Sequence, residues 1–150
     1  MNEDFREILA LLIESGARFL VVGAHALAVH GVPRATGDLD VWIDRDLANT
    51  ERVWTALLRF GAPVVALGVS KADLDAPGTV IQIGLPPRRI DVLTDITGVE
   101  FSAAWPDRLT LQVSGLDVPF LGRIHLIANK RATGRLRDLA DIEALEGSAG

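Results

Sequence analysis

The sequence contains no cysteine, so disulfide bonds and thiolate metal sites are excluded. It also lacks an excess of positive charge. Its formal net charge is −5, so no basic surface for tight nucleic-acid binding is expected, although a transient RNA substrate stays compatible. The apolar runs are far too short to span a membrane, and the N-terminal segment begins acidic and amphipathic rather than basic and then apolar. We therefore expect a cytoplasmic protein with no membrane partner.

What is present suffices for one globular domain. The chain has 150 residues, and 49% of them are hydrophobic, which is enough to bury a core. Repeats, linkers and low-complexity segments are absent from the sequence. Residues 1–150 are therefore predicted to form a single domain.

Hydrophobic spacing and the positions of glycine predict an alternation of helices and strands. Helices are expected over residues 3–15, 24–31, 47–60, around 100–105, and in two C-terminal segments that meet at Gly134. Strands are expected over 18–22, 38–44, 62–68, 78–85, 88–95 and 108–122, the last as two strands that turn near Gly115. This order indicates an α/β (α+β) fold, a mixed sheet with helices mainly on one face and C-terminal helices.

The segment Asp38–Asp44 has an unusual composition for a strand, because apolar residues alternate with aspartates. Successive side chains of a strand point to opposite faces, so Asp38, Asp40 and Asp44 share one face with Trp42. Aspartate is depleted in strands, and carboxylates at i and i+2 lie about 7 Å apart at the backbone, close enough to converge on one cation. Either this face is solvated or a cation binds to it.

Two further segments accompany this strand. In the first, "FLVVGAHALAVHG", a strand ends at a glycine and a helix begins. The second, "RRIDVLTD", follows the Asp-x-Asp segment by about fifty residues and carries one aspartate between apolar residues. The ordered set resembles the nucleotidyltransferase superfamily of polymerase β. That superfamily has a glycine turn, a hydrophobic-Asp-hydrophobic-Asp strand and a third carboxylate on a neighbouring strand. The C-terminal "NKRATGRLRDLADIEAL" also resembles the minimal bacterial branch associated with abortive-infection and toxin–antitoxin pairs.

The resemblance implies a Mg²⁺- or Mn²⁺-dependent transfer of a nucleoside monophosphate from an NTP to an acceptor hydroxyl. Asp38 and Asp40 would hold the metals, and Asp91 would complete the site and orient or deprotonate the acceptor. Two divalent metals about 3.5–4 Å apart suit this chemistry because they clamp the attacking and leaving oxygens. The acceptor stays open between a tRNA 3′ end, a protein side chain and a small molecule, and a cognate antitoxin is a further implied partner.

Five positions are expected to contact the nucleotide: Gly23, Ala24, Arg34, Thr36 and Lys130. Gly23 would let the triphosphate approach the backbone, and the helix that follows would favour its negative charge. Arg34 and Thr36 precede the carboxylates, where they meet phosphate oxygens or serve only as a surface arginine and a turn threonine. The resemblance implies that Lys130 binds phosphate, whereas the alternative is an ordinary surface lysine.

The chain departs from the superfamily at Ala24, where glycine or serine is usual, so a hydroxyl that can bond a phosphate is absent. This departure supports an alternative from another class, a non-catalytic nucleotide-binding or antitoxin-like module that keeps the fold. The three aspartates favour the enzyme. Arg135 and Asp138, which match the Arg-x-x-Asp of the resembled branch, are explained equally well by an ion pair.

Overall fold

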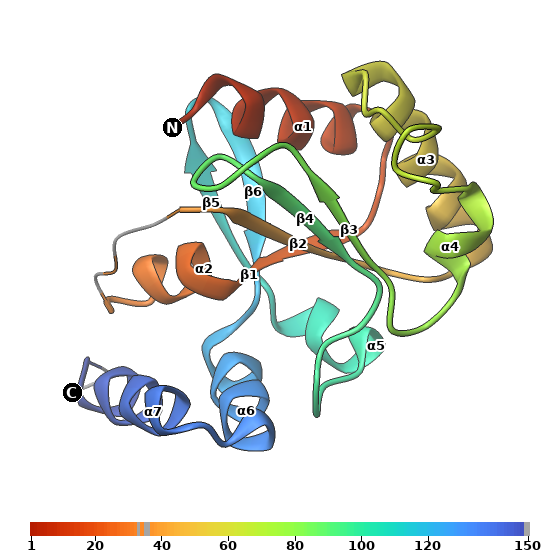
Figure 1. Ribbon diagram of the computed structural model, residues 1–150. Coiled ribbons are helices and arrows are strands. Elements are labelled where there is room, and N and C mark those ends of the chain that lie inside the picture. The colour runs from red at the N-terminus through yellow and green to blue at the C-terminus, as the bar shows by residue number, and fades with distance from the viewer. Residues whose placement is uncertain (33, 35–36, 149–150) are drawn as a thin grey trace.

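A six-stranded mixed sheet lies between two groups of helices in the computed structural model, which describes residues 1–32, 34 and 37–148 (Figure 1). The elements in chain order are α1 (Glu3–Glu14), β1 (Phe19–Val22), α2 (Gly23–Val29), β2 (Leu39–Ile43), α3 (Leu47–Phe60), α4 (Lys71–Asp75), β3 (Val80–Ile83), β4 (Ile90–Leu93), α5 (Phe101–Ala104), a 3₁₀ turn (Trp105–Asp107), β5 (Leu109–Val113), β6 (Leu116–Phe120), α6 (Arg123–Thr133) and α7 (Leu136–Ser148). The strand order is β3-β4-β2-β1-β6-β5. The predicted mixed sheet and C-terminal helices are confirmed. Within the described residues, no helix is long and apolar enough to cross a membrane.

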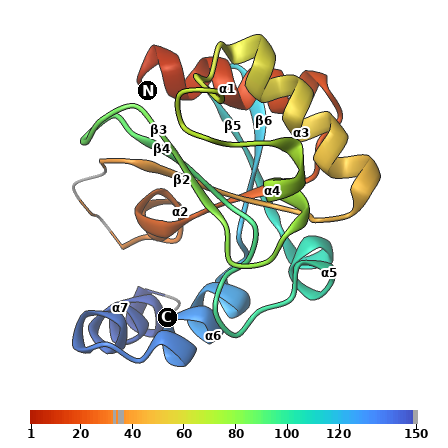
Figure 2. The same ribbon diagram turned by 45° about the vertical axis from the view of Figure 1, so that its right-hand side comes forward.

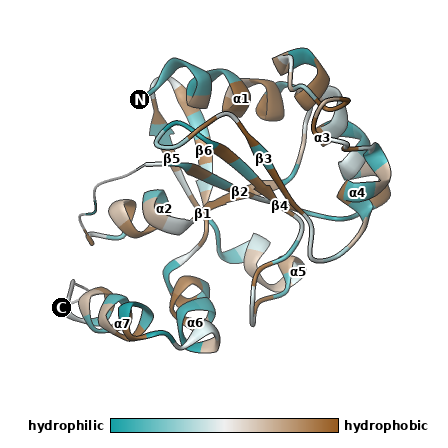
Figure 3. Ribbon diagram, viewed as in Figure 1, coloured by the Kyte–Doolittle hydropathy of each residue, from teal (hydrophilic) through white to brown (hydrophobic). Residues whose placement is uncertain are grey.

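Alternating side chains give the sheet two apolar faces. On one face Val41 and its strand neighbours pack against α1 and α3, and on the other Trp42 packs with residues of α2, α5 and α6. Figures 1 and 2 show these two layers of helices, which are divided between the faces more evenly than we expected. In Figure 3 hydrophilic and hydrophobic colours alternate around α1 and α3, as helices with one buried side require.

Local signals explain where the helices of the first layer begin and end. The Asn2 side chain caps α1 and accepts from the backbone N–H of Asp4 at 2.7 Å. Helix α3 ends at Gly61, whose φ of 84° is a left-handed conformation that favours glycine. These caps set the limits of α1 and α3, whose apolar sides pack against the sheet.

The predicted strand at 62–68 is wrong. This segment forms successive turns, in which the N–H of Val64 donates to the carbonyl of Ala62 at 2.8 Å and that of Leu67 to Pro63 at 2.9 Å. Pro63 has no N–H to give to a strand ladder. Helix α4 was not predicted, although Ser70 and Asp73 form a capping box at its start.

The register of the central strands decides where the predicted site residues lie. Strand β2 runs antiparallel to β1 and pairs Asp40 with Val22. It runs parallel to β4 and pairs Asp40 with Asp91. The end of β1 and the beginnings of β2 and β4 therefore meet at one edge of the sheet, next to α2 (Figure 1).

Candidate active site

Three aspartates predicted from the sequence lie together where β2 and β4 begin. Asp40 and Asp91 are register partners on adjacent parallel strands, so their side chains leave the same face of the sheet side by side. Asp38 lies just before β2, and its carboxylate accepts a hydrogen bond from the residue that precedes β4. Asp91 is only 8% exposed, whereas Asp38 and Asp40 are partly exposed. The structure thus unites the three residues in what we call the sheet cluster.

One arginine binds two of these carboxylates. The guanidinium of Arg89 donates from Nε to Asp91 Oδ1 at 2.7 Å and from Nη2 to Asp91 Oδ2 at 3.1 Å. Its Nη2 also lies 3.3 Å from Asp38 Oδ2, and the backbone N–H of Arg89 donates to Asp38 Oδ1 at 3.0 Å. Both oxygens of each carboxylate therefore contact Arg89. Arg89 and Asp91 are two residues apart in an extended segment, so their side chains leave the same face and this spacing favours the ion pair.

Asp40 has a different environment. Among the described residues, it is the one member of the sheet cluster without an ion pair. Burial, followed by the charge of Asp91 and a hydrogen bond with it, raises the pKa of Asp40 to about 6. The charge of Asp38 adds to this effect, and Arg89 opposes it. The crowded carboxylates therefore favour a proton or another cation at Asp40.

Gly23 makes room for Asp40. Its φ of 67° is left-handed, and a Cβ built on it would lie 2.2 Å from Asp40 Oδ2. Any side chain at this position would therefore displace the carboxylate. The sequence suggested glycine for a close approach of phosphate, whereas in the structure the neighbour that needs the space is Asp40. Ala24 follows as the second residue of α2.

The sheet cluster has the donor chemistry of a hard-cation site but is not a preformed cage. With the side chains as they lie, no three His, Asp or Glu residues in the described part of the chain are arranged to hold a metal. Arg89 already contacts every oxygen of two of the three carboxylates. Mg²⁺ commonly takes one or two protein carboxylates and completes its shell with water and substrate phosphate oxygens. Asp40, beside Asp91, fits a cation that binds together with a phosphate ligand.

A second group of charged residues joins α6 and α7, and we call it the helix cluster. Lys130 Nζ lies 3.4 Å from Asp138 Oδ1 and 3.1 Å from Asp141 Oδ2. Arg135 donates to Asp138 from Nε at 2.7 Å and from Nη2 at 3.2 Å, and Arg34 pairs with Asp141. The Asp138 side chain is fully buried, and the hydrogen bonds from Arg135 hold its pKa well below the usual range.

Several of the remaining predicted site residues belong to the helix cluster. The ion pairs of Arg34 and Lys130 go to aspartates of α7, and their roles toward phosphate stay predictions. Thr36 lies outside the described residues. The ion-pair interpretation of Arg135 and Asp138 is confirmed. Asp141 was missed, although its spacing of three residues from Asp138 places both on one side of a helix.

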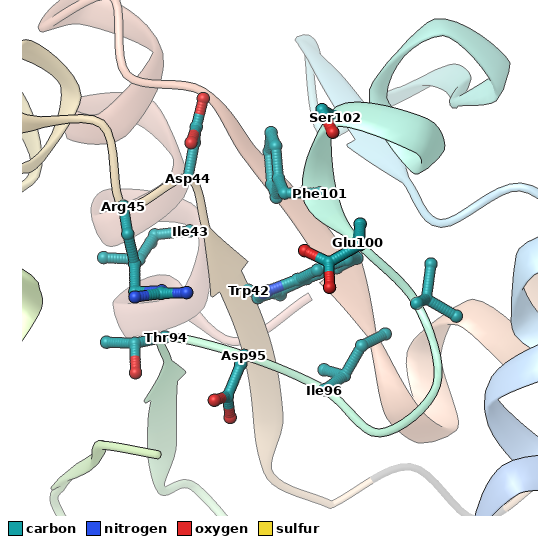
Figure 4. A pocket seen from close by; sticks show the side chains of 11 residues that line it. Trp42, Ile43, Asp44, Arg45, Thr94, Asp95, Ile96, Glu100, Phe101 and Ser102 are labelled. Carbon is teal, nitrogen blue, oxygen red and sulfur yellow. The ribbon is translucent and has the colours of Figure 1, made fainter. Parts of the chain in front are cut away.

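A separate pocket of about 300 Å³ lies at the other end of β2 and β4 (Figure 4). It is lined by Trp42, Ile43, Asp44, Arg45, Thr94, Asp95, Ile96, Val99, Glu100, Phe101 and Ser102. Asp44 pairs with Arg18 at 3.1 Å, and Asp95 accepts from the backbone N–H of Gly78 at 2.8 Å. Strands advance about 3.3 Å per residue, so Asp44 lies about 13 Å along β2 from Asp40. The pocket is distinct from the sheet cluster, and Asp44 is a strand-end aspartate.

Comparison with known proteins gives a structural match and no sequence match. No protein family matches the chain, and no curated protein does. A crystal structure of a putative nucleotidyltransferase from Thermotoga maritima is similar, with a TM-score of 0.58 and 15% sequence identity. The match covers 95% of this chain and 88% of that one. At this identity the likeness shows that the two chains share a fold.

Proposed function

We propose that this protein is a Mg²⁺-dependent nucleotidyltransferase. It transfers a nucleoside monophosphate from an NTP to an acceptor hydroxyl and releases pyrophosphate. The observation that carries the proposal is the adjacency of Asp40 and Asp91 on parallel strands, where Gly23, which has no side chain, leaves space for the Asp40 carboxylate. Support also comes from the fold, which is shared with a chain described as a putative nucleotidyltransferase.

The reaction requires that the negative charge of the triphosphate is neutralised and that the acceptor hydroxyl loses its proton. The acceptor oxygen forms a bond to the α-phosphorus, the bond to the bridging oxygen breaks, and pyrophosphate leaves. Divalent cations supply charge neutralisation on the phosphate oxygens when bound. In this proposal Asp38, Asp40 and Asp91 would hold the cations, and Asp91 would also orient the acceptor hydroxyl and accept its proton.

A transfer assay tests the proposal directly. The protein is incubated with each α-labelled NTP, Mg²⁺ and total cellular RNA or total protein, and label on a macromolecule is measured. Wild-type protein should label an acceptor, and Asp40→Asn should lower the rate by a factor of at least about 100, because a ligand of the cation that neutralises the reacting phosphate is lost. Transfer at the wild-type rate by Asp40→Asn would contradict the assignment of Asp40.

The proposed contacts of the triphosphate include Arg34 and Lys130. Only two lysines occur in the chain, and they form a matched pair for mutation. Lys71 forms an i,i+4 pair with Asp75 at 3.3 Å on α4, whose Leu74 packs on the sheet face opposite to that of Trp42 and Asp40. Lys130→Ala should weaken NTP binding and, because its ion pairs are nearly buried, also lower stability, whereas Lys71→Ala should leave binding unchanged. Equal NTP affinity of the two variants in calorimetry would make Lys130 a purely structural residue.

The finer assignment is a role as the toxin of a toxin–antitoxin pair, with a tRNA or a protein as acceptor. The C-terminal "NKRATGRLRDLADIEAL" carries it, through its resemblance to that branch. Expression in a bacterial host should slow growth, and Asp40→Asn at the same protein level should not. Equal growth of the two strains would leave the transfer activity and remove the toxin role.

Two observations favour a non-catalytic nucleotide-binding or antitoxin-like module as the second candidate. Ala24 lacks the hydroxyl of serine, and Arg89 forms ion pairs with two of the three carboxylates. Such a module would bind NTP or a protein partner without any transfer of label. The module would be favoured if the protein binds NTP but forms no labelled product with any of the four nucleotides.

A further inference from the structure

We propose that Arg89 is a resident counter-cation of the sheet cluster, which a divalent metal must displace from Asp91 and Asp38 before it can bind them. This inference rests on the proposed function, because it concerns the cation of the same site. It assigns to Arg89 a role in controlling when the carboxylates become available.

The hydrogen-bond geometry carries the first step. The guanidinium binds Asp91 through two parallel hydrogen bonds of 2.7 and 3.1 Å, which is the strong bidentate arrangement of arginine with a carboxylate. The same Nη2 reaches Asp38 Oδ2 at 3.3 Å. A metal that coordinates these oxygens would lie next to the guanidinium, so the two positive charges compete for the same carboxylates.

Burial and backbone contacts carry the second step. The N–H of Leu39 donates to the carbonyl of Arg89 at 2.9 Å, and the N–H of Arg89 donates to Asp38 at 3.0 Å, so the backbone is fixed at the start of the β2–β4 ladder. The side chain is 26% exposed, however, so the guanidinium has a route into solvent. Arg89 can therefore release the carboxylates while the strands stay paired.

Charge carries the third step. Fully ionised, the three aspartates bring three negative charges, and Arg89 brings one positive charge. A metal alone must replace the guanidinium, which then loses its anionic partners. A metal that arrives with a nucleotide offers the guanidinium a phosphate instead, and the planar fork of arginine suits phosphate oxygens. Metal and nucleotide are thus expected to bind more tightly together than separately.

The test is a titration of nucleotide-free protein with Mn²⁺, followed by electron paramagnetic resonance of the free ion. Arg89→Gln should bind Mn²⁺ about tenfold more tightly than wild type, because a charged competitor is lost at a partly exposed site. The control is Arg88→Gln, which removes the same charge from the exposed neighbouring position and should stay within about twofold of wild type. Arg89→Lys keeps the charge and loses the bidentate geometry, so its affinity should lie between those of wild type and Arg89→Gln.

Each outcome separates this inference from the proposed function. If Arg89→Gln is poorly folded in circular dichroism, Arg89→Lys decides, and tighter Mn²⁺ binding by it supports displacement. Unchanged or weaker Mn²⁺ binding by folded Arg89 variants overturns the inference and leaves nucleotide transfer to be judged by its own assay. Failure of wild type to transfer label, with tighter Mn²⁺ binding by Arg89→Gln, supports the inference and contradicts the enzyme.

Discussion

The sheet cluster and the helix cluster both bring aspartates together, but they match them with cations in opposite proportions. The sheet cluster has Asp38, Asp40 and Asp91 with one arginine. The helix cluster has two aspartates, Asp138 and Asp141, with three cations. Burial, followed by the charge of Asp91, raises the pKa of Asp40 to about 6, whereas the hydrogen bonds from Arg135 hold the pKa of Asp138 well below its usual range.

This difference separates a cluster that stabilises the fold from one that is incomplete by itself. Each aspartate of the helix cluster has more than one cationic partner, so removal of one carboxylate should leave cations unpaired. In the sheet cluster the carboxylates repel each other, so removal of one should relieve the repulsion. Functional sites commonly carry such a stability cost, and an added cation would relieve it.

The largest expected effect comes from breaking the helix cluster. Asp138→Asn should lower the free energy of unfolding by about 3 kcal/mol, because it breaks a buried, hydrogen-bonded ion pair. Urea unfolding measures this change. Asp117→Asn is the control, because Asp117 is exposed on β6, and it should change stability by less than about 0.5 kcal/mol. Equal effects of the two variants would show that the helix cluster contributes nothing special to stability.

A smaller loss is expected where Gly23 meets Asp40. Gly23→Ala and Gly61→Ala both place alanine at a positive φ, but only at Gly23 would the Cβ collide with a neighbour. Gly61→Ala should cost about 1 kcal/mol, and Gly23→Ala about 1–2 kcal/mol more. In the Gly23→Ala/Asp40→Ala double variant this excess should disappear. A double variant as unstable as the sum of its parts would show that the two residues do not interact.

The two clusters should also respond to pH with opposite signs in metal-free protein. Because the pKa of Asp40 is raised, the folded state holds a proton between about pH 4 and pH 6 that the unfolded state has released. The free energy of unfolding should therefore fall as pH rises through that window, and the contribution of Asp40 should be constant above it. Its size is about 1–2 kcal/mol after allowance for solvent screening of a partly exposed group. The lowered pKa of Asp138 contributes stability above about pH 4 that is lost at lower pH. Urea unfolding in EDTA from pH 3 to pH 8 tests this, and Asp40→Asn should remove only the change between pH 4 and pH 6.

The smallest effect is expected for Asp40→Asn on metal-free protein at neutral pH. Because one of three repelling charges is removed, the variant should be as stable as wild type or more stable by up to about 1 kcal/mol. Thermal melting in EDTA measures this. Mg²⁺ should raise the melting temperature of wild type and have little effect on the variant, because the cation stabilises only the protein that binds it. A clear loss of stability in EDTA would identify Asp40 as a structural residue.

The sequence predicted those parts of the two clusters that depend on local patterns of residues. The alternation of aspartate with apolar residues predicted the strand of Asp38 and Asp40, and the apolar neighbours of Asp91 predicted a second strand. The pairing of those strands, which sets Asp40 beside Asp91, depends on sheet order and entered through a family resemblance. The contact of Arg89 with Asp91 follows from a spacing of two residues, which places both side chains on one strand face. The contact of Arg89 with Asp38 and the pairing of Asp141 with Arg34 join segments far apart in the sequence, which no local pattern encodes. The error at 62–68 arose because an apolar run with proline resembles a short strand.

The central claim is that the sheet cluster binds a metal–nucleotide complex, and calorimetric titration of NTP in the presence of Mg²⁺ tests it most directly. Wild-type protein should bind at least one NTP, the affinity should vanish in EDTA, and Asp40→Asn should bind at least about tenfold more weakly while melting at the wild-type temperature or above it in EDTA. The same affinity for wild type and Asp40→Asn, unaffected by EDTA, would contradict the claim.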